Sequence, residues 1–155
     1  MREMSIAYFD LIGGASGDML LGALIGAGLS LEALRADLTA LRLNDWSLET
    51  ERVTRGGIAA TRAIVRAQDS VQARALNDLL ALVAQSDLPP AIRAASEKIL
   101  RRLGQVEARI HNTPLEKIHL HELGGMDTLI DVVGVVAGLQ RLDIAEIYCA
   151  PFPLA

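Results

Sequence analysis

Two histidines and three carboxylates lie close together in the last third of the chain. If the segment from Ile118 to Glu122 is extended, the side chains of His119 and His121 point to the same side and lie roughly 6 to 7 Å apart. Asp127 and Asp131 are four residues apart and share one face of the helix that follows. Imidazole and carboxylate ligands suit nickel, zinc, manganese or iron. The spacing predicts a metal site, or alternatively a hydrogen-bonded structural cluster, formed by His119, His121, Glu122, Asp127 and Asp131.

A second polar cluster surrounds the glycine-containing loop near the N-terminus, where Asp10, Ser16, Gly17 and Asp18 occur. Glycines allow a ligand to approach the backbone, and free N–H groups at a helix start favour an anion such as phosphate. Two carboxylates would repel a bare phosphate, so a divalent cation is expected between them and the ligand oxygens. The alternative is structural: Ser16 caps a helix, and Asp18 interacts with the positive end of that helix.

A third group consists of arginines. They could hold a small anion in a forked geometry, or they could be solvated residues on the open face of a sheet. Near the C-terminus, Cys149 is expected to be a buried, inert thiol. The arginines are Arg52, Arg55, Arg62, Arg66 and Arg74.

Hydrophobic periodicity and turn signals predict the elements that position these groups. Gly22 with Gly26, and Gly134 with Gly138, should allow helices to pack closely. The order of elements favours a two-layer α/β (α+β) sandwich of ferredoxin-like type, strand-helix-strand-strand-helix-strand with extra helices. The predicted elements are a strand at 5–9, helices from 19 and from 31 to about 44, a hairpin of 46–53 and 58–67, helices near 76–83, from 90 and over 126–142, and a strand at 147–150.

Composition limits the classes of protein that this chain can represent. The 155 residues carry 15 Lys and Arg against 19 Asp and Glu, and the net charge of −4 disfavours nucleic acid or an anionic membrane as partner. One cysteine excludes an internal disulfide and favours a reducing, cytoplasmic setting. The longest apolar stretch, residues 19–29, is far shorter than the about 20 residues that span a bilayer. We expect residues 1–155 to form a single domain.

Four motifs, in this order along the whole chain, resemble the LarC family of nickel-insertion proteins. They are Tyr8-Phe9-Asp10 through Ala15-Ser16-Gly17-Asp18-Met19, Val53-Thr54-Arg55-Gly56-Gly57-Ile58, Ile118-His119-Leu120-His121-Glu122-Leu123-Gly124 through Asp127 to Asp131, and Ile147-Tyr148-Cys149-Ala150-Pro151.

The resemblance implies a cyclometallase of the lyase class that places nickel into a pyridinium bis-thiocarboxylate mononucleotide, giving the nickel-pincer cofactor of lactate racemase. It also implies CTP with Mg or Mn. On this hypothesis His119, His121, Glu122, Asp127 and Asp131 bind the metal, and Asp10 and Asp18, with Glu122 and Asp127, are the catalytic carboxylates. Ser16, Gly17, Arg62 and Arg66 bind the anionic ligand. The expected partners are the precursor, a C-terminal domain of the family chain and further copies in a homo-oligomer.

This chain departs from the family pattern at three places. Leu11 and Ile12 stand where relatives often have cysteine and phenylalanine, and residues 69–72 lack the histidines of many relatives. Relatives also continue well beyond the final strand, so the chain resembles their N-terminal domain. Two other functions remain open: a metal-dependent phosphohydrolase or nucleotide-binding enzyme, and a non-enzymatic scaffold that docks a separate C-terminal domain.

Overall fold

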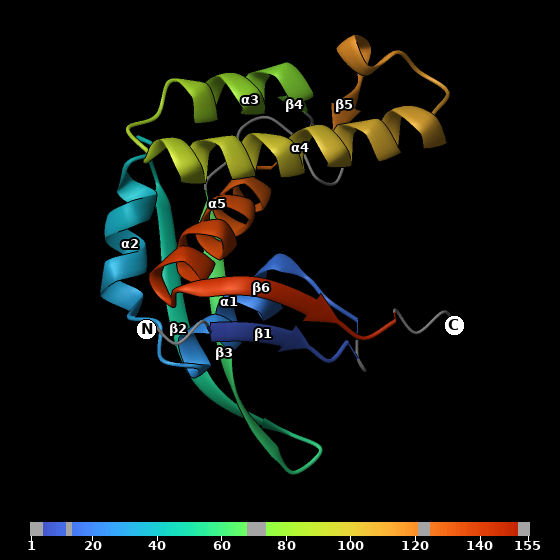
Figure 1. The fold of residues 1–155 in the computed structure, drawn as a ribbon. Coiled ribbons are helices and arrows are strands. Elements are labelled where there is room, and N and C mark those ends of the chain that lie inside the picture. Colours follow the sequence, from blue (N-terminus) through green and yellow to red (C-terminus); the bar gives the residue numbers. More distant parts are fainter. Residues whose placement is uncertain (1–4, 12–13, 68–73, 121–124, 152–155) are drawn as a thin grey trace.

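The computed structural model describes residues 5–11, 14–67, 74–120 and 125–151 (Figure 1). His121 and Glu122 lie outside these ranges. The elements are β1 (Ser5–Phe9), α1 (Gly17–Gly26), α2 (Leu31–Thr39), β2 (Trp46–Arg55), β3 (Ile58–Ala67), β4 (Arg74–Ala75), α3 (Leu76–Ala84), α4 (Pro90–Ile110), the 3-10 turn η1 (Leu115–Lys117), β5 (His119–Leu120), α5 (Met126–Arg141) and β6 (Ile144–Cys149).

Local signals explain most of these boundaries. The Ser30 side chain accepts a hydrogen bond from the Ala33 N–H at 3.2 Å, so it caps α2 as its residue type predicts. Pro90 begins α4, where its missing N–H costs no helical hydrogen bond. Gly56 and Gly57 have φ values of 57° and 81°, so they form the tight turn between β2 and β3. The helix expected to reach Asn44 ends at Thr39 instead.

The mixed α and β class is confirmed, but the strands pair differently from a ferredoxin-like sheet. The described strands form three separate two-stranded ladders: β1 with β6 in parallel, and β2 with β3 and β4 with β5 antiparallel. Helix α1 packs along β3, and the Gly22 backbone lies against the Thr61 carbonyl. Helix α1 thus lies against the hairpin, and β1 pairs with β6 instead of extending the hairpin into one sheet.

Helix α5 is the centre of the packing and contacts α1, α2, α4 and β3. Its two glycines permit the close approach that their spacing predicts. A Cβ at Gly134 would lie 2.9 Å from Leu21 Cδ2, and one at Gly138 would lie 2.8 Å from Leu29 Cδ2. The core around α5 is almost entirely aliphatic, as the small number of aromatic residues requires.

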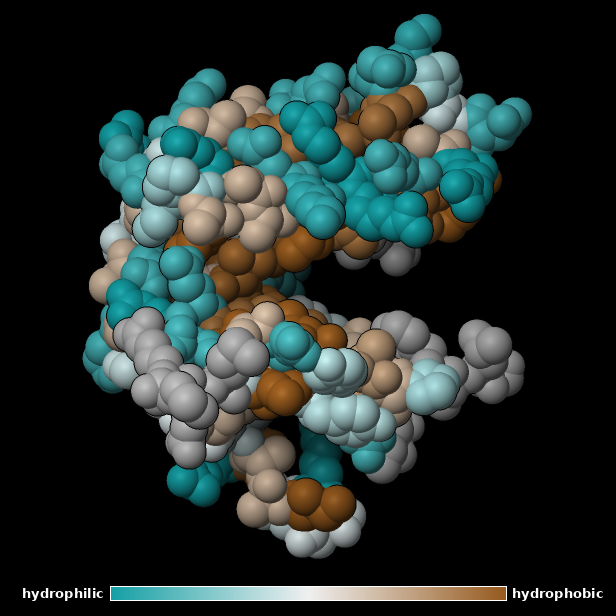
Figure 2. Space-filling model, in the orientation of Figure 1, coloured by the Kyte–Doolittle hydropathy of each residue, from teal (hydrophilic) through white to brown (hydrophobic). Residues whose placement is uncertain are grey.

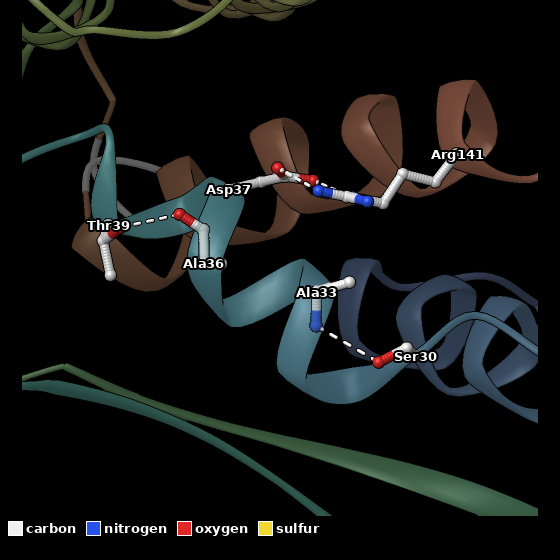
Figure 3. A network of polar contacts seen from close by, with 6 residues as sticks. All are labelled: Ser30, Ala33, Ala36, Asp37, Thr39 and Arg141. Carbon is white, nitrogen blue, oxygen red and sulfur yellow. Dashed lines mark hydrogen bonds and ion pairs between the residues drawn. The ribbon is translucent and has the colours of Figure 1, made fainter.

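A forked ion pair joins α2 to α5 (Figure 3). Arg141 in the last turn of α5 donates through Nη2 to Asp37 Oδ1 at 2.7 Å and through Nε to Asp37 Oδ2. The planar guanidinium matches the carboxylate in this geometry. The pair fixes α2 beside the C-terminal half of α5.

The molecule has two arms with a hollow between them, which Figure 2 shows opening to one side. Helices α3 and α4 lie in the upper arm, β1, β6 and α1 lie in the lower arm, and the β2–β3 hairpin runs from the upper arm down past the lower one (Figure 1). Cys149 ends β6 and is exposed, so the expectation of a buried thiol was wrong. In the described ranges, no helix has the length and apolar character needed to cross a membrane.

Candidate functional site

A close contact between the two predicted polar clusters joins Gly17 to Asp131. A Cβ built at Gly17 would lie 2.3 Å from Asp131 Oδ2 and 2.4 Å from its Cγ. Any larger residue in place of Gly17 would therefore overlap the carboxylate. The absence of a side chain at residue 17 lets the first turn of α1 and the second turn of α5 meet at a carboxyl group.

Asp131 has an unusual environment for an acidic side chain. Its Oδ1 is buried and has no hydrogen-bond partner among the described residues. Burial, followed by the negative charges of Asp18 and Asp127, raises the pKa of Asp131 to about 7. A bound cation would relieve both the desolvation and the repulsion, because it would supply the missing partner and the opposite charge.

The carboxylates of Asp18 and Asp127 each accept a hydrogen bond from the backbone N–H of the following residue. Asp18 Oδ1 accepts from the Met19 N–H at 2.9 Å, and Asp127 Oδ1 accepts from the Thr128 N–H at 2.8 Å. Each residue lies in the first turn of its helix, where a negative charge is favoured. Asp127 and Asp131 thus lie on one face of α5, as their spacing predicts.

Ser16 is the residue before α1, but its hydroxyl does not cap the helix. It makes no side-chain capping bond and instead donates to Asp18 Oδ1. Because Ser16 and Asp18 are both polar and partly or fully exposed, this pair lies open to a ligand.

A groove of about 670 Å³ runs between α1 and the β2–β3 hairpin and includes both residues. Arg55 and Arg62 supply its positive charge, and Met19, Gly22 and Thr61 are among its less polar lining residues. Arg62 Nη1 lies 3.1 Å from Glu51 Oε1, whereas Arg55 makes no ion pair within the described part of the chain. The groove therefore brings anion-binding guanidinium groups and the Asp18 carboxylate to one place.

The other predicted site residues lie apart from this groove. Arg66 pairs with Glu49 at 3.0 Å and is not a lining residue. Asp10 follows β1 and is exposed. His119 is exposed in β5, where it pairs with Ala75 of β4 beside α3 and α4 (Figure 1).

No complete metal site is visible in the described ranges. Within them, no three His, Cys, Asp or Glu side chains are grouped so that they could hold a metal ion. His121 and Glu122, two of the predicted ligands, lie outside the described residues. A metal ion near Gly17 would therefore need donors beyond the described acidic side chains.

Comparisons with known proteins decide the family. The model of the family described as "nickel insertion protein" matches residues 7–155. The chain belongs to this family. A pyridinium-3,5-bisthiocarboxylic acid mononucleotide nickel insertion protein of Desulfitobacterium hafniense is 43% identical over 148 residues, which is 96% of this chain and 37% of that relative. Relatives from Roseiflexus castenholzii and Thermomicrobium roseum are 44% and 43% identical, covering 96% and 98% of this chain and 38% of each relative. No solved structure matches.

The chain thus spans less than two fifths of the length of these nickel-insertion relatives. Sequence reasoning missed two features of the site. The sequence predicts Arg55 only as a member of the basic group, whereas the structure places it in the groove with Arg62. The contact between Gly17 and Asp131 had no local signal, because 114 residues separate them along the chain.

Proposed function

We propose that this chain takes part in inserting nickel into a pyridinium bis-thiocarboxylate mononucleotide, the reaction named for its Desulfitobacterium hafniense relative. Membership of the nickel-insertion family supports the reaction. The observation that carries the site is the contact of Gly17 with Asp131, whose buried Oδ1 has no hydrogen-bond partner among the described residues and feels the charge of Asp18. Nickel is the cargo of this reaction, delivered to the mononucleotide.

In the proposed arrangement, Asp18 and Asp131 hold the divalent ion, with Asp127 contributing charge from the same face of α5. His119, His121 and Glu122 remain proposed ligands. Because the described carboxylates do not form a full ligand set, the thiocarboxylate sulfurs of the precursor would provide donors, and soft sulfur suits nickel better than Mg. Ligation requires neutral imidazole, so nickel affinity should fall in acidic solution.

The groove between α1 and the hairpin is the proposed seat of the mononucleotide. Guanidinium groups bind phosphate in a forked geometry, so Arg55 and Arg62 would hold the phosphate. Ser16 and Gly17 would contact the anionic ligand at the start of α1, and Asp18 would face the metal. Arg66 and Asp10 lie outside the groove, so we do not propose that they contact the mononucleotide.

The proposal extends to the rest of the reaction system. CTP with Mg or Mn is the expected co-substrate, and oxygen donors such as Asp18 and Asp131 fit these hard cations. The C-terminal region of the relatives is the expected partner, and a homo-oligomer is the expected assembly. The single cysteine fits a reducing cytoplasm.

Calorimetric titration with Ni²⁺ tests the proposed metal ligands directly. We expect Asp131→Asn and Asp18→Asn each to weaken nickel binding by about tenfold or more, since each removes a charged ligand. Asp45→Asn is the matched control, because Asp45 is exposed and its φ of 53° also suits asparagine. Equal nickel affinity in the wild type and the three variants would exclude this metal site. Release of phosphate from CTP by the chain, without nickel uptake, would favour a phosphohydrolase instead.

A further inference from the structure

The β1–β6 pair carries exposed side chains on both of its faces. In the parallel register, Tyr8 lies beside Tyr148, and Ala7 lies beside Ile147 on the opposite face. Ile6 and Tyr8 are 61% and 66% exposed, and Ile147 and Tyr148 are 54% and 52% exposed. Figure 2 shows brown, hydrophobic groups beside pale and teal ones in the region that these strands occupy in Figure 1.

Such a pair is incomplete as a β-sheet. Parallel strands occur almost only in sheets that are covered on both faces, and an isolated two-stranded ladder is marginal in water. Four of the nine exposed large hydrophobic side chains among the described residues fall in these two short strands. This concentration marks an interaction surface rather than scattered surface apolar residues.

The geometry restricts what can cover this surface. A second copy that joined edge to edge across a two-fold axis would pair one strand with its own equivalent, antiparallel, and would complete only that edge. Both faces would then stay open. A cover that completes an edge and shields the faces needs strands and packed elements of another part of the polypeptide.

The relatives supply such a region. The matched part makes up 37% to 38% of their chains, so more than half of each relative lies outside it. We propose that this remaining region of the family chain docks on β1 and β6, adds strands to their sheet and covers Ile6, Tyr8, Ile147 and Tyr148. The inference rests on the proposed function for its partner, but it requires no metal binding.

A chimera tests the docking in a full-length protein. In it, the 148 matched residues of the Desulfitobacterium hafniense relative are replaced by this chain. Hydrogen exchange of β1 and β6 amides should slow at least tenfold in the chimera relative to this chain alone. Amides at the hairpin turn, residues 56–57, should exchange alike in both proteins. Equal exchange of β1 and β6 in a folded chimera would overturn the proposal.

Cys149 provides a second readout, because it is exposed and is the only cysteine of this chain. Thiol labelling at Cys149, followed by peptide mass spectrometry, should be fast in the chain alone and at least tenfold slower in the chimera. Ile147→Lys should restore fast labelling in the chimera, because a charge would enter the covered face. The control Ile58→Lys, at a side chain 73% exposed beside the hairpin turn, should leave labelling slow.

Further measurements distinguish failure of the docking proposal from unfolding of the variant and from failure of the proposed function. Ile147→Lys should leave the unfolding midpoint of the chain alone unchanged, since the side chain is already exposed there. If protection of β1 and β6 rises with the concentration of the chain alone, and light scattering shows a dimer, a second copy is the occupant and the proposal fails. Nickel binding by the chimera is measured separately, so loss of nickel binding with protected strands contradicts only the proposed function.

Discussion

Gly17 and Asp131 meet so closely that a single added methyl group would overlap the carboxylate, with its Cβ 2.3 Å from Asp131 Oδ2. This contact connects the helix start after the first strand to the helix that carries Asp127. It also explains why the loop needs glycine at residue 17. The φ of Gly17 is not positive, so the need is for space and not for backbone freedom.

Gly17→Ala should therefore displace the Asp131 carboxylate. We expect the free energy of unfolding to fall by about 1 to 3 kcal/mol, the usual cost of overpacking, and nickel affinity to fall with it. Urea denaturation and calorimetric titration measure the two effects.

Gly26→Ala in the same helix is the matched control for this substitution. Its Cβ would lie 3.4 Å from Thr61 Oγ1, an ordinary contact, and alanine has the higher helix propensity. Stability should stay equal or rise by up to about 1 kcal/mol. A Gly17→Ala protein as stable as Gly26→Ala would mean that the carboxylate moves away at no cost.

The pKa of Asp131, raised to about 7, predicts in which direction the free energy of unfolding changes with pH. The folded carboxyl group holds its proton more tightly than the unfolded one, whose pKa is near 3.8. Between these two values the contribution of Asp131 to the free energy of unfolding falls as the pH rises, and above pH 7 the loss is complete. The charged form is the one that the buried site disfavours.

Asp131→Asn should thus stabilise the protein relative to wild type at pH 8 by about 1 to 3 kcal/mol, allowing for partial solvent screening. At pH 4 the two proteins should unfold at nearly the same urea concentration. Millimolar Ni²⁺ should reduce the difference in free energy of unfolding between the two proteins at pH 8, since it stabilises the charged wild-type form. A difference that is the same at pH 4 and pH 8 would show that the Asp131 charge is not the cause.

Two other glycines should differ in their tolerance of alanine. A Cβ at Gly22 would lie 2.4 Å from the Thr61 backbone carbonyl oxygen, whereas a Cβ at Gly134 would meet the Leu21 side-chain end at 2.9 Å. The backbone of β3 cannot move aside as a leucine methyl group can. Gly22→Ala should lower the free energy of unfolding by about 3 kcal/mol, and Gly134→Ala by about 1 kcal/mol. The reverse order in urea denaturation would contradict this account of how α1 packs.

Local patterns were enough to predict most elements but not the way in which they meet. The Gly56-Gly57 pair predicted the hairpin, and the four-residue spacing of Asp127 and Asp131 predicted their common helix face, because both signals act within a few residues. The parallel pairing of β1 with β6 has no such signal, since it joins the two ends of the described chain. The burial of Asp131 likewise depends on how α1 docks against α5.

The groove between α1 and the hairpin gives a final prediction about ligand charge. Arg55 lines it without an ion pair in the described part of the chain, so its guanidinium is available to a phosphate. Arg55→Gln should weaken binding of nicotinic acid mononucleotide, a pyridinium mononucleotide, by about tenfold, the loss typical of a charge-assisted hydrogen bond. Calorimetry at low ionic strength measures it, because salt screens such contacts.

Arg52→Gln is the control for this substitution, because Arg52 is an exposed arginine of the same strand that does not line the groove. Both substitutions remove one positive charge, so a general electrostatic effect would weaken binding equally in the two variants. A site-specific effect weakens it only at Arg55. Equal losses in Arg55→Gln and Arg52→Gln would therefore remove the groove as the phosphate seat, while leaving the metal ligands Asp18 and Asp131 to be judged by nickel binding alone.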